Sequence, residues 1–244
     1  MQNLPYYALS ALVVLITLTV HEYAHAFAAY KMGDPTARNL GRLTLNPLKH
    51  LDPLGALCML FLHVGWAKPV PINARNFKKP RQGFAITALA GPLVNLVIAF
   101  FSAFIYLALY SMFSQIDFAT EFLLNLAKNT LLFFNLLHVI NLGIALFNLI
   151  PVPPLDGSRI LGLILPPKLY FSIMRHERTI YFVLLGWLFV GNIISDVLLS
   201  FGFIASNPIL SVFASIISLS NLLGYAIEGL SWLMMSFWRL LPFI

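Results

Sequence analysis

The sequence predicts an all-α polytopic membrane protein of about five to six transmembrane helices, with a small β-containing re-entrant loop region after the first helix. Of its 244 residues, 59% are hydrophobic and only 10% are charged, whereas a soluble domain has about 25% charged residues. The apolar residues also gather into stretches as long as the roughly 20 residues that cross a bilayer. No polar stretch is long enough to build a soluble core of its own.

Five apolar stretches are candidates for these helices. They cover residues 5–30, 84–113, 121–150, 179–200 and 203–241. The first lacks the basic region and the small-residue cleavage site of a signal peptide, so we expect it to be retained. The last is too long for one untilted helix across a core of about 30 Å. It forms either one span with an interfacial extension or two spans.

The segment between the first two spans, residues 31–83, has a different composition. Nine of the fifteen Lys and Arg residues lie in it. Its one apolar run, residues 53–66, is short for a full span and suits a re-entrant or interfacial segment. Residues 39–45 and 68–77 combine Pro, Gly and Asn with alternating apolar positions, so we expect short strands there. The edge of such strands could hold an extended peptide, or the strands could serve only as a cover.

The distribution of basic residues predicts the orientation in the membrane. Lys and Arg favour cytoplasmic loops, so segments 31–83 and 151–178 should face the cytoplasm and the 113–120 turn the opposite side. This accounts for the net charge of +6 better than nucleic-acid binding does. Cys58 is the only cysteine, which excludes an internal disulfide and a cysteine zinc site.

A metal-binding motif lies inside the first apolar stretch. His21 and His25 frame the run His-Glu-Tyr-Ala-His, and on a helix their side chains share one face, where both can reach one zinc ion. Glu22 then lies beside the metal, placed to accept a proton from water. Ionisable groups are costly in lipid and are usually functional there. The alternative is a chance match, with histidines that only pair with neighbours on the helix.

A catalytic zinc usually has three protein ligands, so a third is needed. Residues 148–157 bring Asp156 directly after a membrane helix, behind three prolines that break the helix and before a glycine. Irregular backbone at membrane depth is tolerated where it is buried in protein or lines a cavity. Asp156 is therefore a candidate ligand. Alternatively, it caps a following helix over residues 158–163.

Three motifs on three apolar segments carry a family resemblance. They are His21-Glu22-x-x-His25, Ala90-Gly91-Pro92-x-x-Asn95 and Asn148-x-x-Pro151-x-Pro153-x-Leu155-Asp156-Gly157. In this order they resemble the site-2 protease family of intramembrane zinc metalloproteases, in its compact bacterial form. The resemblance covers residues 5–165. It implies one zinc ion per chain, with His21, His25 and Asp156 as ligands and Glu22 as general base and acid.

The same resemblance implies roles for two asparagines. Asn95 would help to hold the substrate or the oxyanion, and Asn148 would bind the substrate backbone. Each has a structural alternative, because asparagines and small residues such as Gly91 also mediate the packing of membrane helices. His138, in the third span, could line a cavity, but a single histidine on a helix more often bonds a neighbour. His50, followed by Asp-Pro, suits a structural turn better than a second metal site.

The function implied is that of an intramembrane zinc-dependent endopeptidase that hydrolyses peptide bonds within or near transmembrane helices. Its expected partners are transmembrane protein substrates and the lipid bilayer, without nucleic acid, and its oligomeric state is left open. We expect a multi-pass protein of the cell membrane with the active site toward the cytoplasm. Residues 1–165 would form the protease core and residues 166–244 additional helices, without the PDZ or CBS domain of many members.

Two other classes of protein are considered. A metal transporter could use the same three ligands as a transit site, but it gives Glu22 no proton-transfer role and usually shows repeated halves, which are not seen here. A non-catalytic scaffold would be expected to lose ligands, and all three are present.

Overall fold

The computed structural model of the chain describes residues 4–52 and 67–242. Four of its helices are long and apolar enough to cross a membrane: α1 (Leu4–Lys31), α4 (Pro80–Phe113), α5 (Glu121–Leu149) and α8 (Glu177–Ser200). A fifth span results if α10 (Pro208–Ile216) and α11 (Leu219–Trp238), bent by 107° at their junction, form one broken span or a re-entrant loop. The helical membrane fold is as expected, and a sixth span stays a prediction.

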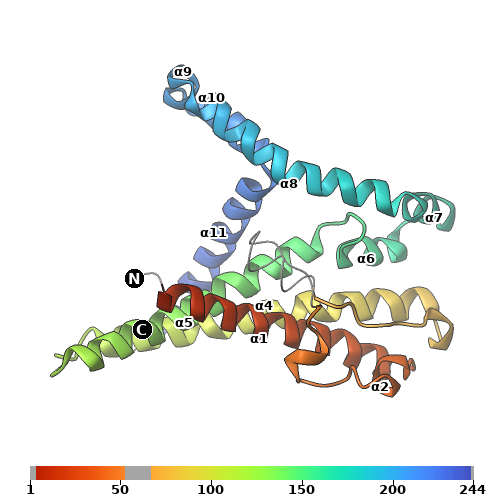
Figure 1. Cartoon of the computed structure of the whole chain (residues 1–244), viewed down its shortest axis with the longest axis horizontal. Helices are drawn as coiled ribbons and strands as arrows, with labels where there is room; N and C mark the ends of the chain where they lie inside the picture. Colours follow the sequence, from red (N-terminus) through yellow and green to blue (C-terminus); the bar gives the residue numbers. More distant parts are fainter. Residues whose placement is uncertain (1–3, 53–66, 243–244) are drawn as a thin grey trace.

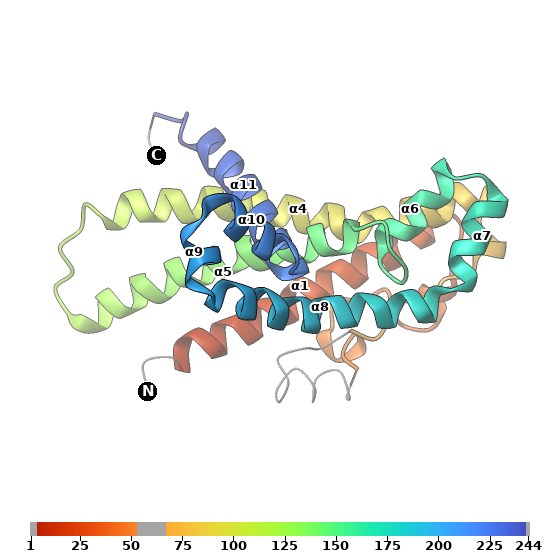
Figure 2. The ribbon, with the colours of Figure 1, turned by 90° about the horizontal axis from the view of Figure 1, so that it is seen from above.

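Helices α1, α4 and α5 pack side by side as a bundle (Figures 1 and 2). Small residues lie at the contacts and let the helices approach closely. Ala88 and Ala99 of α4 and Ala145 of α5 are all between 0 and 2% exposed. Away from these contacts the helices present large apolar side chains at their surfaces, as expected where lipid replaces water.

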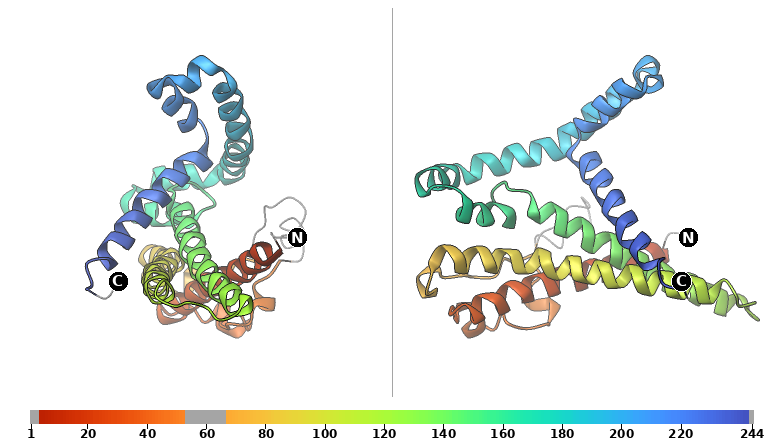
Figure 3. Two further views of the ribbon diagram at one scale, coloured as in Figure 1. Left: turned by 90° about the vertical axis from the view of Figure 1, so that its left-hand side faces the viewer. Right: turned by 180° about the vertical axis from the view of Figure 1, so that it is seen from behind.

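The C-terminal helices lie over this bundle. Helix α8 runs above it and contacts α10 and α11, and α11 crosses from α8 to α4 and α5 (Figure 3). The indole of Trp238 packs on the ring of Phe100 and donates a hydrogen bond of 2.9 Å to its main-chain oxygen. The short helix α9 (Gly202–Ser206) joins α8 to α10.

Shorter helices gather at one end of the bundle, where α1 and α5 end and α4 begins (Figure 1). They are α2 (Thr36–Asn39), η2 (Ala74–Asn76), α6 (Asp156–Ile164) and α7 (Pro167–Arg175). Helix η1 (Pro47–Lys49) lies instead beside the middle of α1, where Pro47 lines a small cavity together with Leu15 and Thr19. Helix α6 packs against α4 and α5, so the loop after α5 is turned back toward the bundle.

The prediction of strands at residues 39–45 and 68–77 is wrong. In the described part of the chain no strand is formed, and the one β-bridge joins Leu51 to Ala67. Residues 39–41 end α2, with Gly41 in the left-handed conformation (φ 68°) and Arg42 N–H bonded to Ala37 O at 2.8 Å. The predicted re-entrant segment, residues 53–66, lies outside the described residues.

The second predicted strand fails for a different reason. Pro69 and Pro71 have no N–H to give to a ladder, and the N–H groups of Val70 and Asn73 are bonded to carboxylates instead. Residues 67–73 are consequently extended without a partner strand.

Candidate metal centre and active site

Two histidines of α1 face the interior of the bundle. His21 and His25 are 4% and 7% exposed, and their Nε2 atoms lie 3.0 Å apart. They are four residues apart on one helix, which brings both side chains to the same face. Both imidazoles therefore converge on one small volume.

The loop after α5 brings a carboxylate to this volume. Asp156 is the first residue of α6, and its Oδ2 lies 3.3 Å from Nε2 of His21 and 3.1 Å from Nε2 of His25. No side chain caps the N-terminus of α6, so Asp156 does not act as the cap considered from the sequence. Burial raises the pKa of this carboxyl, but hydrogen bonds to the two histidines lower it more, and Asp156 is ionised at neutral pH.

The geometry of the three side chains fits zinc. With zinc–ligand distances of about 2.0–2.1 Å, the ligand atoms of a tetrahedral site lie roughly 3.3 Å from one another. The three separations here are 3.0, 3.1 and 3.3 Å. Within residues 4–52 and 67–242, His21, His25 and Asp156 form the one group of three such side chains close enough to share an ion.

One histidine is oriented by a bond to the neighbouring helix. Nδ1 of His25 lies 2.7 Å from the main-chain oxygen of Thr87 in α4. Since a carbonyl can only accept, Nδ1 carries a proton and donates it, so Nε2 is the nitrogen that would bind a metal after losing any proton of its own. Such a contact fixes both the tautomer and the ring orientation of a metal-ligating histidine.

Two glycines allow the close approach of these elements. A Cβ atom at Gly91 of α4 would lie 2.5 Å from Nε2 of His25 and 2.6 Å from Cε1 of His21. A Cβ atom at Gly157 would lie 2.3 Å from the main-chain oxygen of Leu149. Any side chain at either position would displace the histidine pair or the loop that carries Asp156.

Glu22 lies beside the three candidate ligands. It lines the same cavity of about 410 Å³ as His21, His25 and Asp156, and its Oε2 accepts a hydrogen bond of 3.1 Å from the N–H of Val70. The extended segment 67–73 therefore covers the cavity and holds the carboxylate of Glu22.

This extended segment is fastened at a second point by Asp34. The buried carboxylate of Asp34 accepts bonds of 2.7 Å from Asn73 N–H and from the Asn76 side chain. It also accepts a bond of 3.0 Å from the N–H of Thr36, at the start of α2. Asp34 thus ties the extended segment to the end of α1.

The two asparagines are placed differently. Asn148 lines the cavity, where its side-chain amide donates to the main-chain oxygen of Ile144 at 3.0 Å. Asn95 is fully buried on α4, one turn beyond Gly91, and is not among the residues that line the cavity. Neither polar atom of its side chain has a hydrogen-bond partner among the described residues.

Two charged residues of the cavity were not singled out from the sequence. Arg159 and Glu177 line it together with Glu22 and Asp156. Arg159 could have been found, because it follows Asp156 by three residues and so shares its face of a helix. Glu177 had no such signal, since only the return of α8 over the bundle brings it to the cavity.

Two other histidines have structural partners. Nδ1 of His138 donates to the main-chain oxygen of Ala99 and its Nε2 accepts from the hydroxyl of Ser231, both at 2.8 Å, which joins α5 to α4 and α11. Nε2 of His50 bonds the main-chain oxygen of Thr44 at 2.7 Å, in the turn expected there.

Comparison with known proteins agrees with this geometry. A protein-family model described as Peptidase family M50 matches residues 9–189. The chain belongs to this peptidase family. The match includes all three candidate ligands, and the resemblance to the site-2 proteases, which are members of family M50, is confirmed.

Relatives in this family match most of the chain. YwhC of Bacillus subtilis (strain 168), assigned as a zinc metalloprotease, is 38% identical over 221 residues, which cover 88% of this chain and 98% of YwhC. Rip2 of Mycobacterium tuberculosis (strain Erdman) has the same assignment and is 27% identical over 77% of this chain and 74% of its own.

A more distant relative is the zinc metalloprotease MJ0392 of Methanocaldococcus jannaschii. It is 26% identical over 210 residues, which cover 86% of this chain and 47% of MJ0392. No solved structure significantly matches the chain. The M50 chain described here is accordingly a multi-pass membrane metalloprotease with zinc as its cofactor.

Proposed function

We propose that this protein is an intramembrane endopeptidase that hydrolyses peptide bonds within or near the transmembrane helices of membrane-protein substrates. One observation carries the proposal. The ligand atoms of His21, His25 and Asp156 lie within 3.3 Å of one another, beside a cavity that Glu22 also lines. Two of the three ligands and Glu22 belong to a helix that is apolar enough to span the bilayer.

The residues divide into ligands and proton carriers. A zinc ion on His21, His25 and Asp156 supplies Lewis-acid polarisation of the scissile carbonyl and lowers the pKa of bound water toward neutrality. Glu22 is not needed as a ligand, so its carboxylate is free to accept the proton of the attacking water. It then returns this proton to the leaving amine. The bond from Val70 N–H holds the carboxylate in the cavity during both transfers.

Two asparagines complete the proposed site. Asn148 lines the cavity, which supports its proposed contact with the substrate backbone. Asn95 is proposed to donate to the oxyanion, as its unpartnered buried amide has hydrogen-bonding capacity to offer. For Asn95 this requires the substrate-bound state to open a path from the cavity toward α4.

The proposal includes the orientation of the chain in the cell membrane. The two basic segments 31–83 and 151–178 both contribute residues to the cavity wall, such as Val70 from the first and Arg159 from the second, and such segments favour the cytoplasmic side. Water would therefore enter from the cytoplasm. Residues 1–165 supply the proposed catalytic groups, and residues 166–244 add helices over them.

The test separates the roles of Glu22 and Asp156. Candidate single-span proteins are co-expressed with wild type, Glu22→Gln or Asp156→Ala, the fragments are identified by mass spectrometry, and zinc is measured in each purified protein. Glu22→Gln should retain one zinc per chain and abolish cleavage, because it keeps the size of the side chain but removes its basicity. Asp156→Ala should lose zinc and cleavage together.

Two outcomes would overturn the proposal. Cleavage by Glu22→Gln at the wild-type rate would remove the general base. A zinc flux across vesicles that needs His21 and Asp156, with no fragment that depends on Glu22, would favour transport instead.

A further inference from the structure

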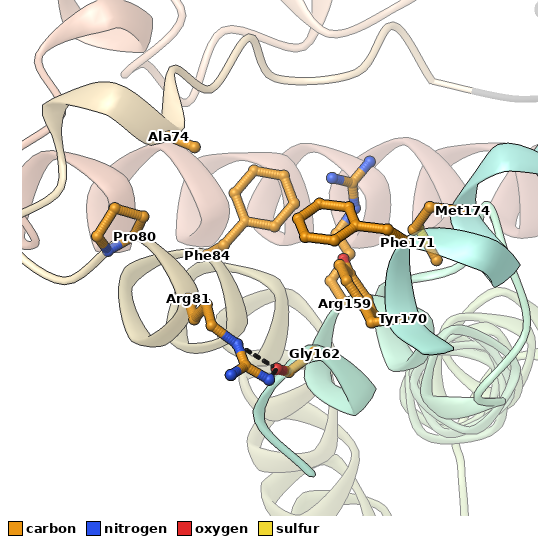
Figure 4. Close-up of a pocket in the computed structure, with 9 residues that line it drawn as sticks. All are labelled: Ala74, Pro80, Arg81, Phe84, Arg159, Gly162, Tyr170, Phe171 and Met174. Atoms are coloured by element: carbon orange, nitrogen blue, oxygen red, sulfur yellow. Dashed lines mark hydrogen bonds between the residues drawn. The ribbon is translucent and has the colours of Figure 1, made fainter. Parts of the chain in front are cut away.

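A second cavity lies beside the proposed active site, between α4, α6 and α7. It has a volume of about 310 Å³ and an almost entirely apolar wall. Phe84 of α4 and Phe171 of α7 point toward each other across it, and Arg159 of α6 also lines it, close to both rings (Figure 4). Met174 and Tyr170 of α7 close one side. The size is at the low end for a ligand pocket, so it suits a single large side chain.

This cavity adjoins the active-site cavity, and three segments of the chain contribute residues to the walls of both. On α6, Asp156 lines the active-site cavity, Gly162 the second cavity, and Arg159 both. On α4, Ala88 lines the first and Phe84, one turn earlier, the second.

The extended segment makes the third connection. Ile72 in this segment lines the active-site cavity, and Ala74, the first residue after the segment, lines the second cavity. All three segments therefore lead from the proposed metal site to the second cavity.

The guanidinium of Arg159 favours an aromatic ring among the apolar groups that could occupy this cavity. Its guanidinium lies 4.7 Å from the ring centre of Phe84, and among the described residues it forms no ion pair. The guanidinium of Arg81, by contrast, is held by the C-terminal end of α6. It donates to the main-chain oxygen of Gly162 (Figure 4) and to that of Leu165. Arg159 can thus offer a second cation–π contact to a ring that enters the cavity.

We propose that this cavity is a specificity pocket for a large apolar side chain of the substrate, aromatic, Leu or Met, near the cleaved bond. The six residues from Asp156 to Gly162 span about 9 Å of helix at ~1.5 Å per residue. An extended peptide advances about 3.3 Å per residue. The pocket therefore binds a substrate side chain about two to three residues from the scissile bond. This inference rests on the proposed protease function.

The experiment uses purified full-length protein with zinc and a randomised peptide library, with cleavage products sequenced by mass spectrometry. Wild type should enrich large apolar residues at one position, about two to three residues from the cut. Met174→Trp, which fills the pocket, should reduce this enrichment at least about tenfold, the usual effect of steric exclusion in an apolar pocket. The matched control is Leu169→Trp on the same helix, at a half-exposed position outside the pocket; it should cleave as wild type does.

A second variant and a second measurement keep the test decisive. If the Met174→Trp protein loses zinc, the Phe171→Trp protein is used in its place. Phe171 is 67% exposed, so its substitution leaves the packing of the core unchanged. Peptides with a photoreactive apolar residue at the enriched position should also crosslink to α7 of the Glu22→Gln protein. Phosphatidylglycerol vesicles should not compete.

The possible failures are distinguishable. If cleavage depends on Glu22 but its side-chain preference is unchanged by Met174→Trp and by Phe171→Trp, the specificity pocket is wrong and the protease proposal stands. If photoreactive phosphatidylglycerol labels α7 and the peptides do not, the cavity holds lipid. If wild type cleaves no peptide and no membrane protein, both proposals fall.

Discussion

The main-chain N–H of Val70 donates a hydrogen bond of 3.1 Å to Oε2 of Glu22 across 48 positions of sequence. The side chain of Val70 is 8% exposed and packs with Ala26 and Ala37 against the end of α1. The proposed general base is thus positioned by an extended segment that is itself anchored by core packing. Its geometry depends on whatever holds that segment in place.

Asp34→Ala should reduce cleavage while zinc stays bound. The change removes the acceptor of Asn73 N–H and the Asn76 amide, which fasten the extended segment 67–73 and the following η2 to the end of α1, but it touches none of the candidate ligands. A displacement of the order of 1 Å at a catalytic group costs up to about 100-fold in rate. Zinc content and cleavage rate measured on the same preparation check this. Asp117→Ala, in the exposed 113–120 turn, is the control and should leave both unchanged.

Asp34 should also make stability depend on pH in the acid range. Burial raises the pKa of its carboxyl, but the bonds from Thr36, Asn76 and Asn73 lower it more, so its pKa in the fold is below the ordinary value. The stabilisation is therefore complete above the unfolded pKa of about 4 and is lost as the pH falls through the lower folded value. The difference in melting temperature between wild type and Asp34→Asn should be constant from about pH 7 to 5 and shrink below about pH 4. A difference that grows on acidification would contradict this sign.

Gly91→Ala should lower zinc affinity and activity together. The new Cβ would lie 2.5 Å from Nε2 of His25, a separation that real structures do not tolerate, so α4 or the histidine pair must move. Alanine is otherwise the better helix former by about 1 kcal/mol. Gly186→Ala in α8, where a Cβ meets nothing within 4 Å, is the matched control and should be neutral or slightly stabilising. Competition with a zinc chelator ranks the three proteins, and equal zinc retention by Gly91→Ala would argue against the close packing of α4 on the histidines.

Cysteines introduced at Lys79 and Asp117 should label from opposite sides of the membrane. These positions flank α4, one of the helices apolar enough to span it, and the basic residues of 31–83 favour the cytoplasm. Replacement of Cys58, the only cysteine, gives a clean background. A membrane-impermeant reagent added to intact cells should modify position 117 and reach position 79 only after lysis. Equal labelling from outside would refute the orientation.

The long helices could be read from composition because they depend on local properties of the chain. The apolar stretches predicted at 5–30, 84–113 and 121–150 correspond to α1, α4 and α5 within a few residues at each end. In lipid the backbone must satisfy its own hydrogen bonds, so a long apolar stretch has helix as its one open-chain solution. The prediction of strands rests on alternating apolar positions together with Pro, Gly and Asn, and such a pattern does not show where each N–H finds its acceptor.

The spacing of His21 and His25 by itself determined that both side chains share one face, because the turn of a helix is a local property. Only the tertiary structure decided what meets that face. Asp156 reaches it because α6 folds back on α4 and α5, the carbonyl of Thr87 because α4 packs at Gly91, and Val70 because the extended segment is tied to Asp34. These contacts join residues far apart in sequence, so they depend on how whole helices pack and not on any local pattern.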